Sequence, residues 1–179
     1  MCSFVCPHAV IRPFVVDSDS KYALDGVALI GDKDSKYKFI ISVSEADCTG
    51  CASCVEVCPG KGGNKALKMD AIDMKKQKLA NTLFNFYKNP EISDKFTIKG
   101  SQLESPKLEF SGACAGCGET PYIKLLTQLY GDRLIIANAT GCSSIYGASV
   151  PSMPYSTPWA NSLFEDNAEF GYGIYYGYK

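Results

Sequence analysis

The chain has 179 residues, of which 46% are hydrophobic and 21% are charged, and its formal net charge is −1. This balance is typical of a globular protein, and the lack of a basic stripe argues against nucleic-acid binding. No apolar run approaches the roughly 20 residues of a membrane-spanning helix. We therefore expect neither nucleic acid nor a membrane as a partner. The length allows one or two domains, and the distribution of nine cysteines favours two.

The chain opens with Cys2, Cys6 and Pro7, spaced like the end of the motif C-x2-C-x2-C-x3-C-P. The first two cysteines of this copy would lie before Met1. We therefore expect the chain to be an internal piece of a longer polypeptide. His8 follows directly, and we expect it to be a packing or hydrogen-bonding residue rather than a ligand.

A complete copy of the motif runs from Cys48 through Cys51 and Cys54 to Cys58 and Pro59. With this spacing, bacterial-type ferredoxins hold 4Fe-4S clusters: three thiolates on a tight loop bind one cluster, and the fourth binds another. Proline also restricts the residue before it, which ends a helix at Cys58. The motif predicts an electron-transfer protein.

The two copies together predict the ligand sets, because the fourth cysteine of each motif ligates the other motif's cluster. One set is complete: Cys6, Cys48, Cys51 and Cys54. Cys2 and Cys58 are half of a second set. A zinc ribbon would need only two C-x2-C pairs, and a disulfide framework suits short secreted chains, so this spacing disfavours both.

These motifs predict an α+β ferredoxin-like 4Fe-4S module over residues 1–79. Within it, residues 15–38 have the character of an insertion with turns rich in Asp, Lys and Ser. Residues 80–106 are expected to be a connector, with Pro106 marking the next boundary. A short amphipathic helix is predicted there, broken at Asn89-Pro90, from Leu79, Leu83, Phe84 and Tyr87.

A third cysteine group lies downstream, at Cys114, Cys117 and Cys142. Between Cys117 and Cys142 the sequence predicts a helix that begins at Thr120-Pro121 and ends at Gly131. Its apolar face would consist of Ile123, Leu126 and Tyr130. Residues 134–137 then predict a buried strand, whose carboxyl end delivers residues 140–144 into a loop where ligands collect in α/β sheets. Three thiolates brought together in this way could bind a third cluster, although a fourth ligand is absent from the chain.

At this point the residues carry a family resemblance. A ferredoxin module followed by the motifs at 112–121 (GACAGCGETP), 138–147 (NATGCSSIYG) and 159–171 (WANSLFEDNAEFG) resembles pyruvate:ferredoxin (flavodoxin) oxidoreductase. The match runs nearly from end to end. The resemblance implies that residues 107–179 are the start of an α/β thiamine-diphosphate-binding domain.

The resemblance also implies a homodimeric enzyme that converts pyruvate and coenzyme A to acetyl-CoA and CO2 and passes electrons to ferredoxin or flavodoxin. Thiamine diphosphate would supply the carbanion chemistry. Carried over by motif, Cys114, Cys117 and Cys142 resemble the ligands of the cluster nearest the thiamine. Glu119 and Cys142 match positions that contact thiamine. Glu119 would promote the imino tautomer of the aminopyrimidine, although a glutamate in the first turn of a helix is also favourable to its dipole alone.

Some family features are missing. The pyruvate-binding domains and the Gly-Asp-Gly…Asn anchor for Mg2+ are absent, so the Mg2+ ligands are expected outside this chain and the chain alone is expected to be inactive. The loop between Tyr155 and Trp159 is shorter than in the family, and residues 171–179 depart into a Tyr/Gly tail. No residue is assigned as catalytic, and the polar run formed by Glu165, Asp166, Asn167 and Glu169 is assigned no role.

Two other readings stay open at this stage. One is a polyferredoxin-like electron carrier without catalysis. The other keeps the enzyme family but changes the 2-oxoacid or the electron acceptor. Because the clusters are oxygen-sensitive, we expect the cytoplasm of an anaerobe, or a hydrogenosome in a eukaryote.

Overall fold

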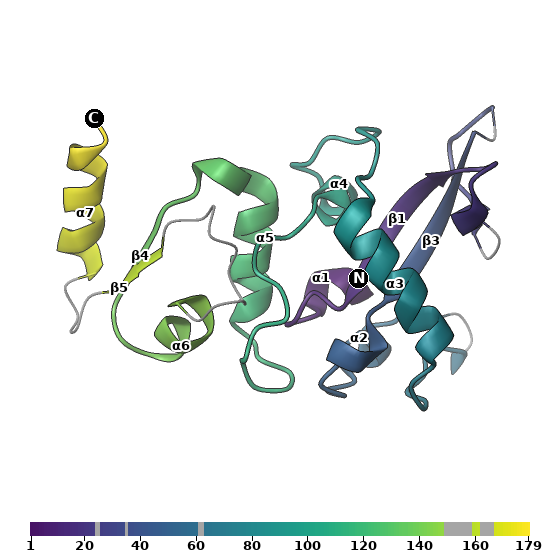
Figure 1. Ribbon diagram of the computed structural model, residues 1–179, viewed down its shortest axis with the longest axis horizontal. Helices are drawn as coiled ribbons and strands as arrows, with labels where there is room; N and C mark the ends of the chain where they lie inside the picture. The colour runs from purple at the N-terminus through teal and green to yellow at the C-terminus, as the bar shows by residue number, and fades with distance from the viewer. Residues whose placement is uncertain (24–25, 35, 61–62, 149–158, 162–166) are drawn as a thin grey trace. The chain divides into compact units, whose positions relative to one another are not determined.

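The computed structural model describes residues 1–179 apart from 24–25, 35, 61–62, 149–158 and 162–166. The chain falls into two compact units (Figure 1). The first unit contains residues Met1–Cys6 and Val10–Ser105, and the second contains Pro7–Ala9 and Pro106–Lys179. None of the helices in these described parts is both long enough and apolar enough to cross a bilayer.

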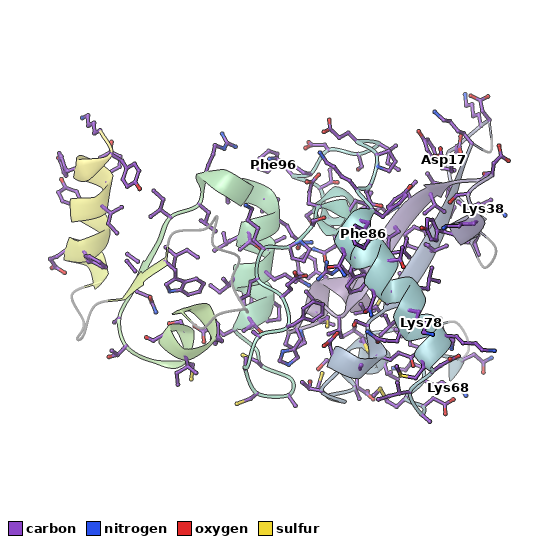
Figure 2. All side chains as sticks on the ribbon, viewed as in Figure 1. Asp17, Lys38, Lys68, Lys78, Phe86 and Phe96 are labelled. Carbon is purple, nitrogen blue, oxygen red and sulfur yellow. The ribbon has the colours of Figure 1, made fainter. Side chains whose placement is uncertain are left out.

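A three-stranded antiparallel sheet forms the centre of the first unit. Its strands are β1 (Ile11–Asp17), β3 (Tyr37–Val43) and β2 (Val27–Ala28), in the order β1-β3-β2. Ile11 pairs with Val43 and Asp17 pairs with Tyr37, so Asp17 and Lys38 mark the end of the hairpin far from Ile11 (Figure 2). The insertion predicted at residues 15–38 therefore begins and ends in strands that pair with each other, which the sequence analysis did not predict.

Helix α3 (Met74–Phe86) covers this sheet and starts earlier than the sequence predicted. The Asp73 side chain caps it by accepting the N–H of Lys75 at 2.8 Å. A 3-10 turn, η1 (Lys21–Ala23), closes the end of the resulting core. The buried residues of that core are Phe14, Val16, Ala23, Ile40 and Leu83.

The outer edge of β1 is covered by side chains that follow α3. Pro13 has no N–H to donate, which suits an edge strand. The Asn89 side chain accepts the N–H of Val15 at 2.8 Å and donates to the carbonyls of Pro13 and Leu103. The Tyr87 hydroxyl donates to the carbonyl of Val15 at 2.7 Å. The Asn89-Pro90 segment thus seals an edge that would otherwise expose unpaired backbone groups.

The remaining elements of the first unit are short. They are the helices α1 (Cys2–Val5), α2 (Ser53–Glu56) and α4 (Ile98–Leu103) and the 3-10 turn η2 (Glu45–Asp47). Helix α4 is capped by the Thr97 hydroxyl, which accepts the N–H of Gly100 at 3.0 Å, and it packs against β1.

The second unit alternates helices with two parallel strands. In chain order it contains α5 (Thr120–Tyr130), the 3-10 turn η4 (Gly131–Arg133), β4 (Ile136–Asn138), α6 (Cys142–Ala148), β5 (Trp159–Asn161) and α7 (Asn167–Gly177). β4 and β5 pair in parallel, with Ile136 opposite Trp159. Helix α7, which includes most of the Tyr/Gly tail, packs against β4.

Two predictions for this unit can be compared with the structure. The helix begins at Thr120, has Pro121 in its first turn, and ends at Gly131, which adopts a left-handed φ of 52°, so that prediction is confirmed. The strand predicted at residues 134–137 begins later, at Ile136, and its residues are half-buried rather than buried.

The buried face of α5 is polar. Leu126 and Tyr130, two members of the predicted apolar face, are 40% and 44% exposed. The Thr127 hydroxyl instead accepts the backbone N–H of Lys107 at 3.0 Å and donates to the carbonyl of Lys124 at 2.7 Å. The residues of α5 that are buried are Thr120, Lys124, Thr127 and Gln128.

Candidate iron–sulfur sites

The loop before α2 bends tightly around the cysteines that it carries. Gly50 and Ala52 both adopt left-handed backbone conformations, with φ of 72° and 60°. A Cβ atom at Gly50 would meet nothing within 4 Å, so its glycine is explained by φ rather than by space. Ala52, which precedes α2, holds the same conformation at a cost of about 1 kcal/mol. This local strain curls the segment that carries Cys48, Cys51 and Cys54.

The thiol of Cys54 is influenced by the charges of three other cysteines. Burial raises the pKa of the Cys54 thiol, and the charges of Cys6, Cys48 and Cys51 raise it further. Cys6 comes from the end of α1, which packs beside α2. Four thiolates converging on one region are the donor set of a cubane.

Among the residues that the structure describes, no three His, Cys, Asp or Glu side chains are arranged to hold a single metal ion.

Cys58 lies in a different environment from these four. Its Sγ accepts the backbone N–H of Ala66 at 3.2 Å, and this bond is the main cause that lowers the pKa of the Cys58 thiol. The chain after Cys58 folds back so closely that a Cβ atom on Gly60 would lie 1.8 Å from the carbonyl oxygen of Asn64. The Lys65 Nζ fixes the same loop by donating to the last carbonyls of α2, those of Val55 and Glu56, at 2.8 and 2.7 Å.

Cys2 and His8 also have distinct surroundings. Cys2 packs against the apolar cluster of Cys6, Val10 and Ile11. His8 is 2% exposed, and its Nδ1 lies 3.2 Å from the carbonyl oxygen of Ser111. The expectation that His8 forms hydrogen bonds is therefore confirmed.

The second candidate site begins at a turn before α5. The N–H of Cys117 donates to the carbonyl of Cys114 at 3.0 Å, and Gly116 permits the turn with a φ of 72°. The Sγ of Cys117 accepts the N–H of Glu119 at 3.5 Å. Burial raises the pKa of the Cys117 thiol, but the N–H groups of Thr120 and Glu119 outweigh it and the pKa is lowered. The amino end of α5 thus favours a thiolate at Cys117.

Cys142 begins helix α6, and a hydrogen-bonded network fixes the loop before it. The Asn138 side chain donates to the Ser143 hydroxyl at 2.6 Å and to the carbonyl of Ala139 at 3.0 Å. The indole N–H of Trp159 donates to the Asn138 side-chain oxygen at 2.7 Å. Because Asn138 ends β4 and Trp159 starts β5, the two parallel strands together set the position of Cys142.

Tyr146 links the separate segments of the second site. Burial is the main cause that raises the pKa of its hydroxyl, and Glu119, Cys117 and Cys142 raise it further. Glu119, Cys117 and Cys142 thus all influence one buried hydroxyl, while Cys114 is joined to Cys117 by the turn at Gly116. The sequence analysis did not identify Tyr146. Its spacing of four residues from Cys142, which places both on one helix face, was the available signal.

Only part of the remaining polar run lies among the described residues. Glu165 and Asp166 lie outside the described residues, as does most of the loop between Tyr155 and Trp159. Glu169 is exposed in the first turn of α7.

Known proteins match both parts of the chain. Residues 1–62 match the family model of a 4Fe-4S dicluster domain. The chain is 50% identical over 98% of its length to pyruvate-flavodoxin oxidoreductase of Klebsiella pneumoniae. It is 52% identical over 97% of its length to pyruvate:ferredoxin oxidoreductase of Moorella thermoacetica. It is also 48% identical over 99% of its length to pyruvate dehydrogenase (NADP(+)) of Cryptosporidium parvum.

These relatives are much longer than the chain. It spans 16% of the first two and 10% of the third. Nearly the whole of this chain therefore corresponds to one region of larger enzymes.

Proposed function

We propose that this chain is the electron-exit region of an enzyme that oxidises pyruvate with coenzyme A to acetyl-CoA and CO2. Electrons would leave through 4Fe-4S clusters to ferredoxin or flavodoxin. The observation that carries the proposal is the similarity to such oxidoreductases along nearly the whole chain. The convergence of Cys6, Cys48 and Cys51 on Cys54 supports it independently, because it supplies the four thiolates of one cluster.

The residues of the first unit would hold clusters and surround their sulfurs with donors. Cys6, Cys48, Cys51 and Cys54 would bind one cluster, and Cys2 and Cys58 would contribute to a second. The N–H of Ala66, already bonded to the Cys58 sulfur, would stabilise its thiolate. When bound, the clusters supply one-electron transfer.

The second unit would serve the thiamine. We propose that residues 107–179 are part of a thiamine-diphosphate-binding domain, with residues 1–79 as the ferredoxin-type domain and residues 80–106 as the connector. The parallel β4–α6–β5 arrangement supports an α/β domain here. Cys114, Cys117 and Cys142 would bind the cluster nearest the thiamine, and Glu119 and Cys142 would contact the cofactor. The Mg2+ ligands would come from outside this chain.

We also propose that the complete enzyme is a homodimer that works in an oxygen-poor compartment, the cytoplasm or a hydrogenosome. Both statements rest on the family resemblance.

The decisive test uses the complete enzyme that contains this chain. Pyruvate-dependent reduction of a viologen dye should require both thiamine diphosphate and coenzyme A. The 179-residue chain alone, reconstituted anaerobically, should show no such reduction. A complete enzyme with normal clusters but no coenzyme A-dependent oxidation of any 2-oxoacid would contradict the proposal and favour a polyferredoxin-like carrier.

A further inference from the structure

Tyr146 on α6 carries a buried hydroxyl whose role the ligand sets leave unexplained. Its side chain is 2% exposed. Among the described residues, no group forms a hydrogen bond of good geometry with the hydroxyl. Buried polar groups are nearly always paired in folded proteins, because an unpaired one loses its hydration without compensation. The neighbours of this hydroxyl therefore indicate its function.

The Tyr146 ring is held rigidly on several sides. It meets the indole of Trp159 edge-on, with ring centroids 6.3 Å apart and an interplanar angle of 89°. It forms a small core with Leu108, against which Ala113 and Ile123 pack. Ala113 directly precedes Cys114, and Ile123 lies one turn after Glu119 on α5. The ring is thus fixed between the cysteine turn and the start of α5.

The groups that influence the hydroxyl are negatively charged hydrogen-bond acceptors. Burial is the main cause that raises the pKa of Tyr146. A hydrogen-bond interaction with the Glu119 side chain and the charges of Glu119, Cys117 and Cys142 raise it further. A hydroxyl in this setting keeps its proton and can donate a hydrogen bond, whereas an ionised carboxylate can only accept one. The side chain of Glu119 is itself exposed, so little else restricts where its carboxylate points.

We propose that Tyr146 is a positioning residue for Glu119: its hydroxyl donates a hydrogen bond to the Glu119 carboxylate and orients that carboxylate toward the thiamine. Hydrogen bonds to a charged acceptor are short and directional, so one such bond from a rigid ring can fix an exposed side chain. This inference rests on the proposed function, since it takes Glu119 as the thiamine contact.

A double-mutant cycle in the complete enzyme tests the inference. The dissociation constant of thiamine diphosphate with Mg2+ is measured by calorimetry for the parent, Tyr146→Phe, Glu119→Gln and the double variant. Loss of one charge-assisted hydrogen bond should weaken binding about tenfold in Tyr146→Phe. The double variant should bind no more weakly than Glu119→Gln alone, because the tyrosine acts through the carboxylate. Tyr122→Phe, whose ring is 70% exposed on the same unit, is the matched control and should bind normally.

The outcomes separate the two levels of the argument. If the two losses multiply in the double variant, or if Tyr146→Phe binds like the parent, the inference is overturned and the proposed function stands. If the parent itself binds no thiamine diphosphate, both are overturned. Should Tyr146→Phe fail to accumulate, Glu119→Asp replaces it. That change withdraws the carboxylate from the hydroxyl by one methylene, and unaltered thiamine binding in it would refute the positioning role.

Discussion

The two units of the chain fill their interiors with different chemistry. In the first unit, six of the seven residues of β1 are buried, and an apolar core joins the sheet to α3. In the second unit, all three residues of β4 are only half-buried, and the buried residues of α5 are polar. Large side chains such as Tyr122 and Ile145 are 70% and 69% exposed there.

This difference in the two interiors affects how each unit positions its cysteines. A three-stranded sheet with an apolar face packed on a helix can be stable by itself, whereas two short parallel strands normally need cover on both faces. The first unit can therefore fix its cysteine loops with its own core. The second unit fixes Cys142 mainly through the hydrogen bonds of Asn138, and we expect it to depend on further packing.

The largest expected contrast concerns cluster binding by the reconstituted chain. Cys51→Ser removes one of four converging thiolates, so the stable cluster should be lost entirely. Cys117→Ser leaves that set intact, and most of the cluster should remain. Visible absorption near 400 nm, a region typical of iron–sulfur clusters, together with iron analysis, measures both. The parent should hold about one stable 4Fe-4S cluster per chain, and equal losses in the two variants would show that the ligand sets are drawn wrongly.

The second contrast concerns stability. Leu83 is 0% exposed in the first core, whereas Leu126 on α5 is 40% exposed. Leu83→Ala should lower the free energy of unfolding by about 2–5 kcal/mol, the usual cost of a new cavity. Leu126→Ala should change it by only about 0.5 kcal/mol. Urea denaturation followed by far-ultraviolet circular dichroism compares them, and a Leu126→Ala loss as large as that of Leu83→Ala would mean that Leu126 also packs in an apolar core.

Local sequence rules predicted the ends of α5 well. Proline in the first helical turn and glycine after the last are decided by backbone geometry alone, and the structure has both at Pro121 and Gly131. The buried face of the same helix could not be predicted from periodicity. Which side is covered depends on the segment at Lys107 and Leu108, whose N–H groups need the Thr127 hydroxyl as an acceptor.

The strands of the first unit were missed for a similar reason. The stretch that connects β1 and β3 is rich in turn residues. The pairing of Asp17 with Tyr37 and of Val16 with Lys38 depends on tertiary contacts rather than on the local sequence. In the candidate sites, motif spacing identified the cysteines. The contact of Lys65 with the end of α2 has no comparable pattern, because it depends on how the loop after Cys58 folds back. The spacing of Tyr146 from Cys142 places both on one face of α6 but does not indicate that Tyr146 is buried.

A third comparison replaces one asparagine in each unit. Asn89→Ala leaves three backbone groups of the first unit without their partner, including the N–H of Val15. It should destabilise that unit by about 1–3 kcal/mol in urea denaturation. Asn138→Ala frees the indole of Trp159, the chain's single tryptophan. Its main effect should be a red shift of tryptophan fluorescence as the ring gains access to water. An unshifted spectrum would show that the strands hold Trp159 without Asn138.

The smallest expected effect tests how the first unit supports the Cys58 loop. Lys65 donates to two carbonyls at the end of α2, a four-residue helix with no side-chain cap at its start. Lys65→Met keeps the aliphatic stem but removes both hydrogen bonds, which should lower the free energy of unfolding by about 0.5–1 kcal/mol. Because α2 carries Cys54, a chelator should also remove iron from the reconstituted cluster a few-fold faster.

The matched control for this change is Lys68→Met. Lys68 pairs with Asp70 in solvent, with side-chain exposures of 83% and 62% (Lys68 is labelled in Figure 2). An exposed pair of this kind contributes little to stability, so iron release from Lys68→Met should match the parent. Both variants lose one positive charge from the same stretch of chain, so a general electrostatic effect on the cluster would accelerate release in both. Faster release in Lys65→Met alone would assign the effect to its hydrogen bonds with α2, and equal rates in the two variants would contradict that role.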